Sequence, residues 1–166
     1  MEVREREHAA QIEEVYRRRY GKFLRVAVAI LRDEQLGEEA VNDAFVRALR
    51  HRRGYVERGS LEPWLWRIVV NEARRSRSIE KRTILSLRPV LDSLPGAANG
   101  HHAGGAVEAI VAALPERQRL ALFLRYYADL DYEAIATALG VKPGTVAATL
   151  HAAHAALRRQ LLEVER

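Results

Sequence analysis

The segment DYEAIATALGVKPGTV, residues 131–146, is the stretch of this sequence that decides its fold. It has the pattern of a helix, a short turn and a second helix, with Ile135 and Leu139 facing inward. Gly140 can adopt the left-handed conformation at which a helix ends, and Pro143 suits the first position of the next helix. Because a glycine turn lets two helices cross steeply, the second can project into a DNA major groove. The segment therefore predicts a helix-turn-helix; the alternative is an ordinary helical hairpin.

The second helix of this segment carries little positive charge. Between Lys142 and Arg158 the sequence has no lysine or arginine. Because basic side chains that neutralise phosphates dominate DNA affinity, few groups remain to contact a duplex. The candidate DNA contacts are the polar residues at the start and along the outward face of the helix: Lys142, Thr145, Thr149 and His151. The alternative is that this alanine-rich face docks on a protein.

The rest of the chain also has helical spacing. Apolar residues recur at three- and four-residue steps in segments 12–31, 41–49, 61–69, 107–114 and 120–127. Residues 33–37 and 54–59 are expected to interrupt the first three helices. The expected core of the second helix is Val41, Ala44, Phe45, Ala48 and Leu49, and that of the third is Leu61, Trp64, Leu65, Ile68 and Val69. No segment alternates apolar and polar residues as a strand would, so the sequence predicts an all-α protein.

A change of composition divides the chain in two. Residues 78–105 contain Pro89, Pro95 and a run of small residues, and residues 84–105 carry only one basic and one acidic residue. Such a segment favours a linker, flexible at least after Pro95, although a helical turn around 84–91 is compatible with it. We therefore predict two small helical domains, 1–77 and 106–166, joined by the linker 78–105.

Charge and composition narrow the class of function. The formal net charge is +5 and the pI is about 9.9, and the excess lies in residues 1–83, which hold 19 Lys/Arg and 14 Asp/Glu. This favours a polyanionic partner. The absence of cysteine excludes disulfides and thiolate metal sites. No apolar run is long enough to span a bilayer and the first residues are charged, so a cytoplasmic protein without membrane contact is expected.

The third helix combines basic and aromatic residues. Several of them are expected on or near the side away from the Trp64 and Ile68 core: Trp66, Arg67, Val70, Asn71, Arg74, Arg75 and Arg77. Aromatic rings stack on unpaired bases, Asn hydrogen-bonds base edges and Arg binds phosphates. The loop before the helix contributes Tyr55, Arg58 and Ser60, and such a loop can receive a flipped base. The alternative is a solvated basic helix whose aromatic residue packs on a neighbour.

Taken together, these segments resemble the extracytoplasmic-function sigma factors of bacterial RNA polymerase. GSLEPWLWRIVVN, residues 59–71, is similar to the family block Gly-Ser-Phe-x-x-Trp-Leu-x-x-Ile-Ala-x-Asn. EEAVNDAFVRALR, residues 38–50, is similar to the polymerase-binding segment, and LPERQR, residues 114–119, to the opening of the DNA-binding domain that ends in the helix-turn-helix. The resemblance covers nearly the whole chain apart from the N terminus and the linker.

The resemblance implies a role for each part. Residues 1–77 would be sigma domain 2, which binds core polymerase and recognises and melts the minus-ten element; residues 106–166 would be sigma domain 4, which binds the minus-thirty-five element and the polymerase flap. Contacts with the clamp helices are implied for Glu39, Asn42, Asp43 and Arg47. Contacts with the minus-ten element are implied for Tyr55, Arg58, Ser60, Trp66, Arg67, Asn71, Arg74 and Arg75. An anti-sigma factor is a further implied partner.

Other chemistry finds little support in the sequence. His101 and His102 have no acidic or cysteine neighbour, and His151 and His154 fit a helix surface better than a metal site. No nucleophile set or phosphate-binding glycine loop is present, so we expect no enzyme, metal or cofactor. The competing hypotheses are a stand-alone DNA-binding regulator and a sigma-like regulatory protein whose helix-turn-helix docks on a protein partner.

Overall fold

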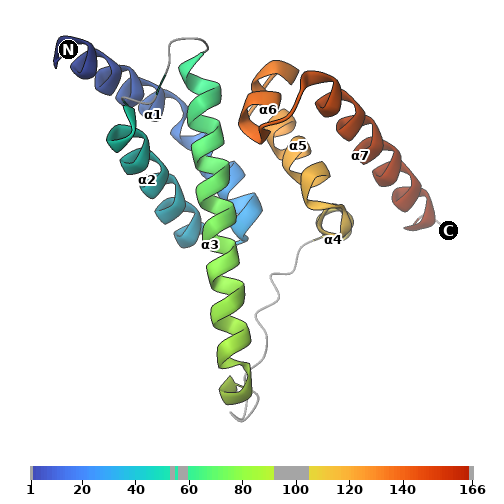
Figure 1. Cartoon of the computed structure of the whole chain (residues 1–166). Coiled ribbons are helices and arrows are strands. Elements are labelled where there is room, and N and C mark those ends of the chain that lie inside the picture. The colour runs from blue at the N-terminus through green and yellow to red at the C-terminus, as the bar shows by residue number, and fades with distance from the viewer. Residues whose placement is uncertain (1, 53–54, 56–59, 92–104, 165–166) are drawn as a thin grey trace.

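The computed structural model describes residues 2–52, 55, 60–91 and 105–164, and most of these residues are helical (Figure 1). The helices are α1 (Glu2–Leu31), α2 (Glu34–Arg50), α3 (Leu61–Leu91), α4 (Ala106–Ala113), α5 (Glu116–Tyr126), α6 (Tyr132–Leu139) and α7 (Pro143–Val164). The predicted all-α class is confirmed. We call α1–α3 the N-terminal bundle and α4–α7 the C-terminal unit.

The break between α1 and α2 is tighter than expected. Arg32 has a left-handed backbone, with φ of 60°, and Asp33 caps α2 by accepting a 2.8 Å hydrogen bond from the Leu36 backbone N–H. Gly37 lies inside α2, where a Cβ would stand 2.7 Å from a methyl carbon of Val28. The interruption therefore occupies Arg32 and Asp33 rather than 33–37, and Gly37 serves the close approach of α1 and α2.

The core of the N-terminal bundle is centred on Trp66. Its side chain is 0% exposed, and its ring centroid lies 4.3 Å from that of Phe23 on α1. The expectation that Trp66 and Val70 lie on the exposed side of the helix is therefore wrong. The buried stripe of α3 is Leu65, Trp66, Val69, Val70 and Ala73, whereas Leu61, Trp64 and Ile68 are half-buried.

The C-terminal unit contains the helix-turn-helix in α6 and α7, and this prediction is confirmed. Asp131 caps α6 by accepting from the Ala134 N–H at 2.8 Å. Gly140 ends α6 with φ of 66°, and its N–H faces the carbonyl oxygens of Ala136 and Thr137. Pro143 is the first residue of α7, the predicted position.

Replacing Gly140 with alanine should destabilise the C-terminal unit by about 1–2 kcal/mol, because a Cβ is strained in the left-handed conformation. The added Cβ would meet nothing closer than the Arg67 guanidinium at 3.7 Å, so the cost is one of backbone conformation. Gly144→Ala is the matched control: its Cβ meets nothing within 4 Å, and alanine is the better helix former. Urea denaturation followed by circular dichroism measures both variants; equal midpoints would contradict the role of Gly140.

Helix α3 continues beyond the boundary expected from composition. It extends to Leu91, so residues 78–91 of the expected linker are helical, and residues 92–104 lie outside the described part. Figure 1 shows this second half of α3 projecting past α1 and α2. Ile79, Ile84 and Leu85 are each at least 50% exposed there.

The N-terminal bundle and the C-terminal unit pack against each other. Helix α3 lies along α6, and α1 contacts α5 (Figure 1). Within the described residues, ion pairs join the units: Lys22 Nζ lies 2.8 Å from Asp129 Oδ2, and Arg74 Nε lies 2.9 Å from Glu116 Oε1. The hydrogen bond from Lys22, together with its charge, lowers the pKa of the exposed Asp129 carboxyl. We call this packing of the two units the closed arrangement, and it was not predicted from the sequence.

Candidate functional site

The outer face of α2 presents polar residues of both signs. Glu39, Asn42, Asp43 and Arg47 are all exposed on this helix. The side chain of Asn42 is oriented by α1, because its Oδ1 accepts a 2.9 Å hydrogen bond from the Tyr16 hydroxyl. Its amide N–H₂ group therefore stays available to a partner.

The same helix also exposes apolar side chains that the sequence did not single out as functional. Val46 is 46% exposed and Leu49, expected in the core, is 37% exposed. The helical periodicity predicted Leu49 in the core with Ala48 and Phe45, but Leu49 lies at the edge of this buried stripe. Apolar groups surrounded by polar ones are typical of a protein-binding surface, and we call Glu39, Asn42, Asp43, Val46 and Leu49 the α2 face.

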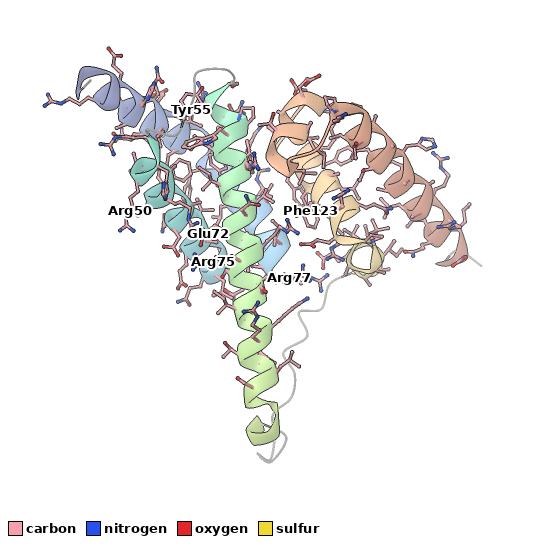
Figure 2. The ribbon with its side chains drawn as sticks, viewed as in Figure 1. Arg50, Tyr55, Glu72, Arg75, Arg77 and Phe123 are labelled. Carbon is pink, nitrogen blue, oxygen red and sulfur yellow. The ribbon has the colours of Figure 1, made fainter. Side chains whose placement is uncertain are left out.

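A buried carboxylate links the α2 face to α3. Glu72 is 8% exposed; its Oε2 lies 3.1 Å from Arg47 Nε and its Oε1 lies 3.3 Å from Arg75 Nη1. Figure 2 shows Glu72 and Arg75 on the side of α3 that faces α2. A buried acid is stable when its charge is compensated in this way. Only the three-dimensional packing identifies Glu72, since glutamate on a helix is ordinarily exposed.

The candidate DNA residues of α3 divide between two directions. Arg75 points toward α2, whereas Arg67 and Arg74 point toward the C-terminal unit: Arg74 pairs with Glu116, and the Arg67 Nη2 lies 3.7 Å from the Cβ position of Gly140. Asn71 is exposed. Trp66 is buried and cannot stack on a base in this arrangement.

The loop residues before α3 are only partly described. Ser60 is exposed directly before α3. Tyr55 is half-buried, with its ring centroid 5.3 Å from that of Trp64 and 5.6 Å from that of His8. Arg58 lies outside the described residues. The aromatic residues near the start of α3 that are partly exposed are therefore Tyr55 and Trp64, and not Trp66.

The candidates on α7 and in the turn before it are weakly basic and mostly exposed. Lys142, Thr145 and His151 are exposed, whereas Thr149 is half-buried and donates its hydroxyl to the Thr145 carbonyl at 2.7 Å. A hydroxyl bound within its own helix is less available to DNA. In the closed arrangement, moreover, the turn before α7 lies beside Arg67.

Two further properties concern the part of the chain that is described. No helix in it is both long and apolar enough to cross a membrane. It also contains no group of three or more His, Asp or Glu side chains able to hold a metal ion. His101 and His102 lie outside it.

Comparison with known proteins gives two matches to family models, and the similar proteins are named as sigma factors. Residues 15–83 match the family model Sigma-70 region 2, and residues 104–157 match Sigma-70, region 4. The chain is 29% identical over 154 residues to an RNA polymerase sigma-E factor of Streptomyces avermitilis, covering 91% of this chain and 85% of that protein. It is 28% identical over 157 residues to the ECF RNA polymerase sigma factor SigE of Mycolicibacterium smegmatis, covering 90% of this chain and 61% of that protein.

Two solved structures share the arrangement of helices. One is CnrH in complex with the cytosolic domain of CnrY, with a TM-score of 0.70, 19% identity and coverage of 98% of this chain and 99% of that one. The other is the sigma factor RpoE in complex with the anti-sigma factor NepR from Bartonella quintana, with a TM-score of 0.58, 21% identity and coverage of 93% and 99%. At these identities the likeness concerns the fold.

Proposed function

The chain belongs to the extracytoplasmic-function group of the sigma-70 family of RNA polymerase sigma factors, and from that premise we propose how its helices divide the work. It is a transcription initiation factor that binds core RNA polymerase and directs it to promoter DNA. The proposal concerns which residues carry each contact, where the domains end and which further partner binds.

The α2 face binds the clamp helices of core polymerase. The observation that carries this assignment is that polar Glu39, Asn42 and Asp43 and apolar Val46 are exposed together on one helix. Exposed apolar groups supply contact area, and the surrounding charges select the partner and speed association. Arg47 belongs to the same surface through its ion pair with Glu72.

Helix α3 and the residues before it bind the minus-ten element. Ser60, Arg67, Asn71 and Arg74 are exposed on α3 or directly before it, and they combine phosphate-binding cations with a base-contacting amide. Tyr55 and Trp64 provide aromatic rings for an unpaired base. Because Arg67 and Arg74 contact the C-terminal unit here, promoter binding requires the two units to separate.

The remaining assignments follow the same division. Domain 2 comprises residues 1–77 and domain 4 residues 106–166, joined by residues 78–105, of which the first half is helical. The chain works by binding, without catalysis of its own, in the cytoplasm. Because one similar structure holds the sigma factor RpoE in complex with the anti-sigma factor NepR, we also assign this chain an anti-sigma factor as a partner.

Binding to core polymerase tests the proposed function directly. The sequence lacks cysteine, so a single cysteine at exposed Ala155 allows specific labelling for fluorescence anisotropy. We expect saturable binding to core enzyme, and transcripts from promoter fragments only when both chain and core are present. Absence of binding at micromolar core enzyme would overturn the sigma assignment and leave the protein-docking regulator.

A second candidate function is that the helix-turn-helix docks on a protein partner. The observation that favours it is the absence of lysine and arginine between Lys142 and Arg158. Changing Ala147 to Lys and Thr149 to Arg should strengthen promoter binding and steepen its salt dependence, by up to about 0.9 in the logarithmic slope for each new phosphate contact. Filter binding at salt concentrations from about 50 to 200 mM measures how the logarithm of the binding constant falls with the logarithm of the salt concentration. An unchanged slope, with weakened binding to a protein partner, would favour docking on protein instead.

A further inference from the structure

A pocket of about 190 Å³ lies between the N-terminal bundle and the C-terminal unit. Figure 2 shows Arg77 on the side of α3 that faces α4 and α5, and Phe123 on the side of α5 that faces α3. Residues of both units line the pocket: Ala29, Arg32, Arg77, Val111, Ala112, Arg119 and Phe123. The pocket therefore exists only while the two units are packed together.

Three arginines converge on this pocket. Burial lowers the pKa of Arg119, and the neighbouring charges of Arg77 and Arg32 lower it further, so the three guanidinium groups lie within electrostatic reach of one another. The acid that counteracts them is Glu116, and both of its carboxylate oxygens already accept hydrogen bonds from Arg74, at 2.9 and 3.4 Å. Among the described residues, no ion pair includes Arg32, Arg77 or Arg119.

The arginines are held in place by the fold. Arg119 Nη1 donates to the carbonyl oxygens of Ala112, at 2.9 Å, and Leu114, at 2.6 Å, so it fixes the end of α4 and keeps its other N–H groups for a ligand. Arg32 follows α1 in a left-handed conformation, which is uncommon for a residue with a Cβ and recurs at ligand sites. Like charges repel when gathered in this way, and a bound anion would compensate them.

We propose that this pocket binds the pyrophosphate group of a small anion and that the bound anion holds the two units in the closed arrangement. Planar guanidinium groups match phosphate oxygens with paired hydrogen bonds, and several converging arginines suit a group with several charges. Val111 and Phe123 add apolar lining beside the arginines. The pyrophosphate group can come from free pyrophosphate or from a nucleotide.

The site couples anion binding to the position of the C-terminal unit. A ligand that binds the closed arrangement and not the open one shifts the equilibrium toward the closed one. In the closed arrangement Arg67 and Arg74 contact the C-terminal unit, so the anion should weaken promoter binding. This last step rests on the proposed function; anion binding and closure do not.

Isothermal titration of the full chain with sodium pyrophosphate, ATP and inorganic phosphate, at constant ionic strength, measures binding. We expect saturable pyrophosphate binding with one site per chain, weakened at least tenfold by Arg77→Gln. Arg82→Gln, which removes the same charge from an exposed part of α3 outside the pocket, should bind as the unmodified chain does. Tighter binding of ATP than of pyrophosphate would identify a nucleotide as the source, and the reverse would identify free pyrophosphate.

Closure is measured separately, by distances between spin labels on cysteines introduced at exposed Gln11 and Ala155. Pyrophosphate should shift the distances toward a single short population, and it should fail to do so in Arg77→Gln. Unmeasurable binding, or equal binding to Arg77→Gln and the unmodified chain, would each overturn the proposal. A chain that binds pyrophosphate but not core polymerase would refute the sigma assignment while leaving this site intact.

Discussion

Replacing Trp66 with alanine is expected to lower the free energy of unfolding of the N-terminal bundle by about 3–5 kcal/mol, the range for truncating a large buried aromatic residue. Trp66 is 0% exposed and packs on Phe23, which in turn packs on Phe45 at a centroid distance of 5.3 Å. Alanine would leave a cavity where α1, α2 and α3 meet. Urea denaturation followed by far-ultraviolet circular dichroism measures the loss without relying on the fluorescence of the residue removed.

Trp66→Phe is the matched control for this prediction. The buried Trp66 Nε1 has no hydrogen-bond partner within the described residues, so phenylalanine removes no such bond and keeps most of the ring. Because phenylalanine fills part of the space of the indole, its cost should be clearly smaller than that of Trp66→Ala. Equal costs for the two substitutions, or a negligible cost for Trp66→Ala, would show that the indole does not fill the core as described.

Changing Glu39 to Ala together with Asp43 to Arg is expected to weaken binding to core RNA polymerase at least thirtyfold, which corresponds to a loss of about 2 kcal/mol, the threshold of an interface hot spot. Both side chains are exposed on the α2 face, so the loss would come from removed contacts and a reversed charge. Fluorescence anisotropy with labelled chain gives the affinity, and repetition at higher salt shows how much of it is electrostatic.

The control for this variant is Glu14→Ala together with Glu7→Arg, which changes the net charge equally on exposed positions of α1. It should bind core polymerase as the unmodified chain does. If both double variants lose the same affinity, the effect is one of overall charge and the α2 face is not the polymerase surface. If neither does, the surface lies elsewhere on the chain.

Local sequence signals predicted the helix-turn-helix because each of its steps has a specific residue. Gly140 takes a conformation that other residues avoid, Pro143 suits the first position of a helix, and Asp131 caps α6. Such requirements act over a few residues and leave a direct imprint on the sequence. The Asp33 cap at the start of α2 is a local signal of the same kind, but it was not identified from the sequence, which predicted the interruption at 33–37.

The position of Trp66 was predicted wrongly because α3 is apolar on two sides. Leu65, Val69 and Trp66 face the bundle, while Trp64 and Ile68 are half-buried on other sides of the helix. Periodicity shows that a helix has apolar faces, but it does not show which one meets α1 and α2. The buried face is set by contacts between residues far apart in the chain, such as that of Trp66 with Phe23.

The closed arrangement and the pocket between the units could not be predicted from the sequence for the same reason. Lys22 lies on α1 and Asp129 in the turn between α5 and α6, while Arg77 and Arg119 belong to separate helices, and neither pair follows a spacing rule. Glu72 was missed for a related reason: its burial depends on arginines of two helices. Pairings over long sequence distances become visible only when the helices are assembled.

The position of Glu72 also bears on how substitutions combine in this protein. One carboxylate serves Arg47, beside the α2 face, and Arg75, on α3. Loss of either arginine leaves the other to compensate a buried charge, whereas loss of both leaves that charge with neither partner. The effects of substitutions at 47 and 75 should therefore be non-additive, as for residues in one ion-pair network. A double-mutant cycle, repeated with Glu72 replaced, would assign the coupling to this carboxylate.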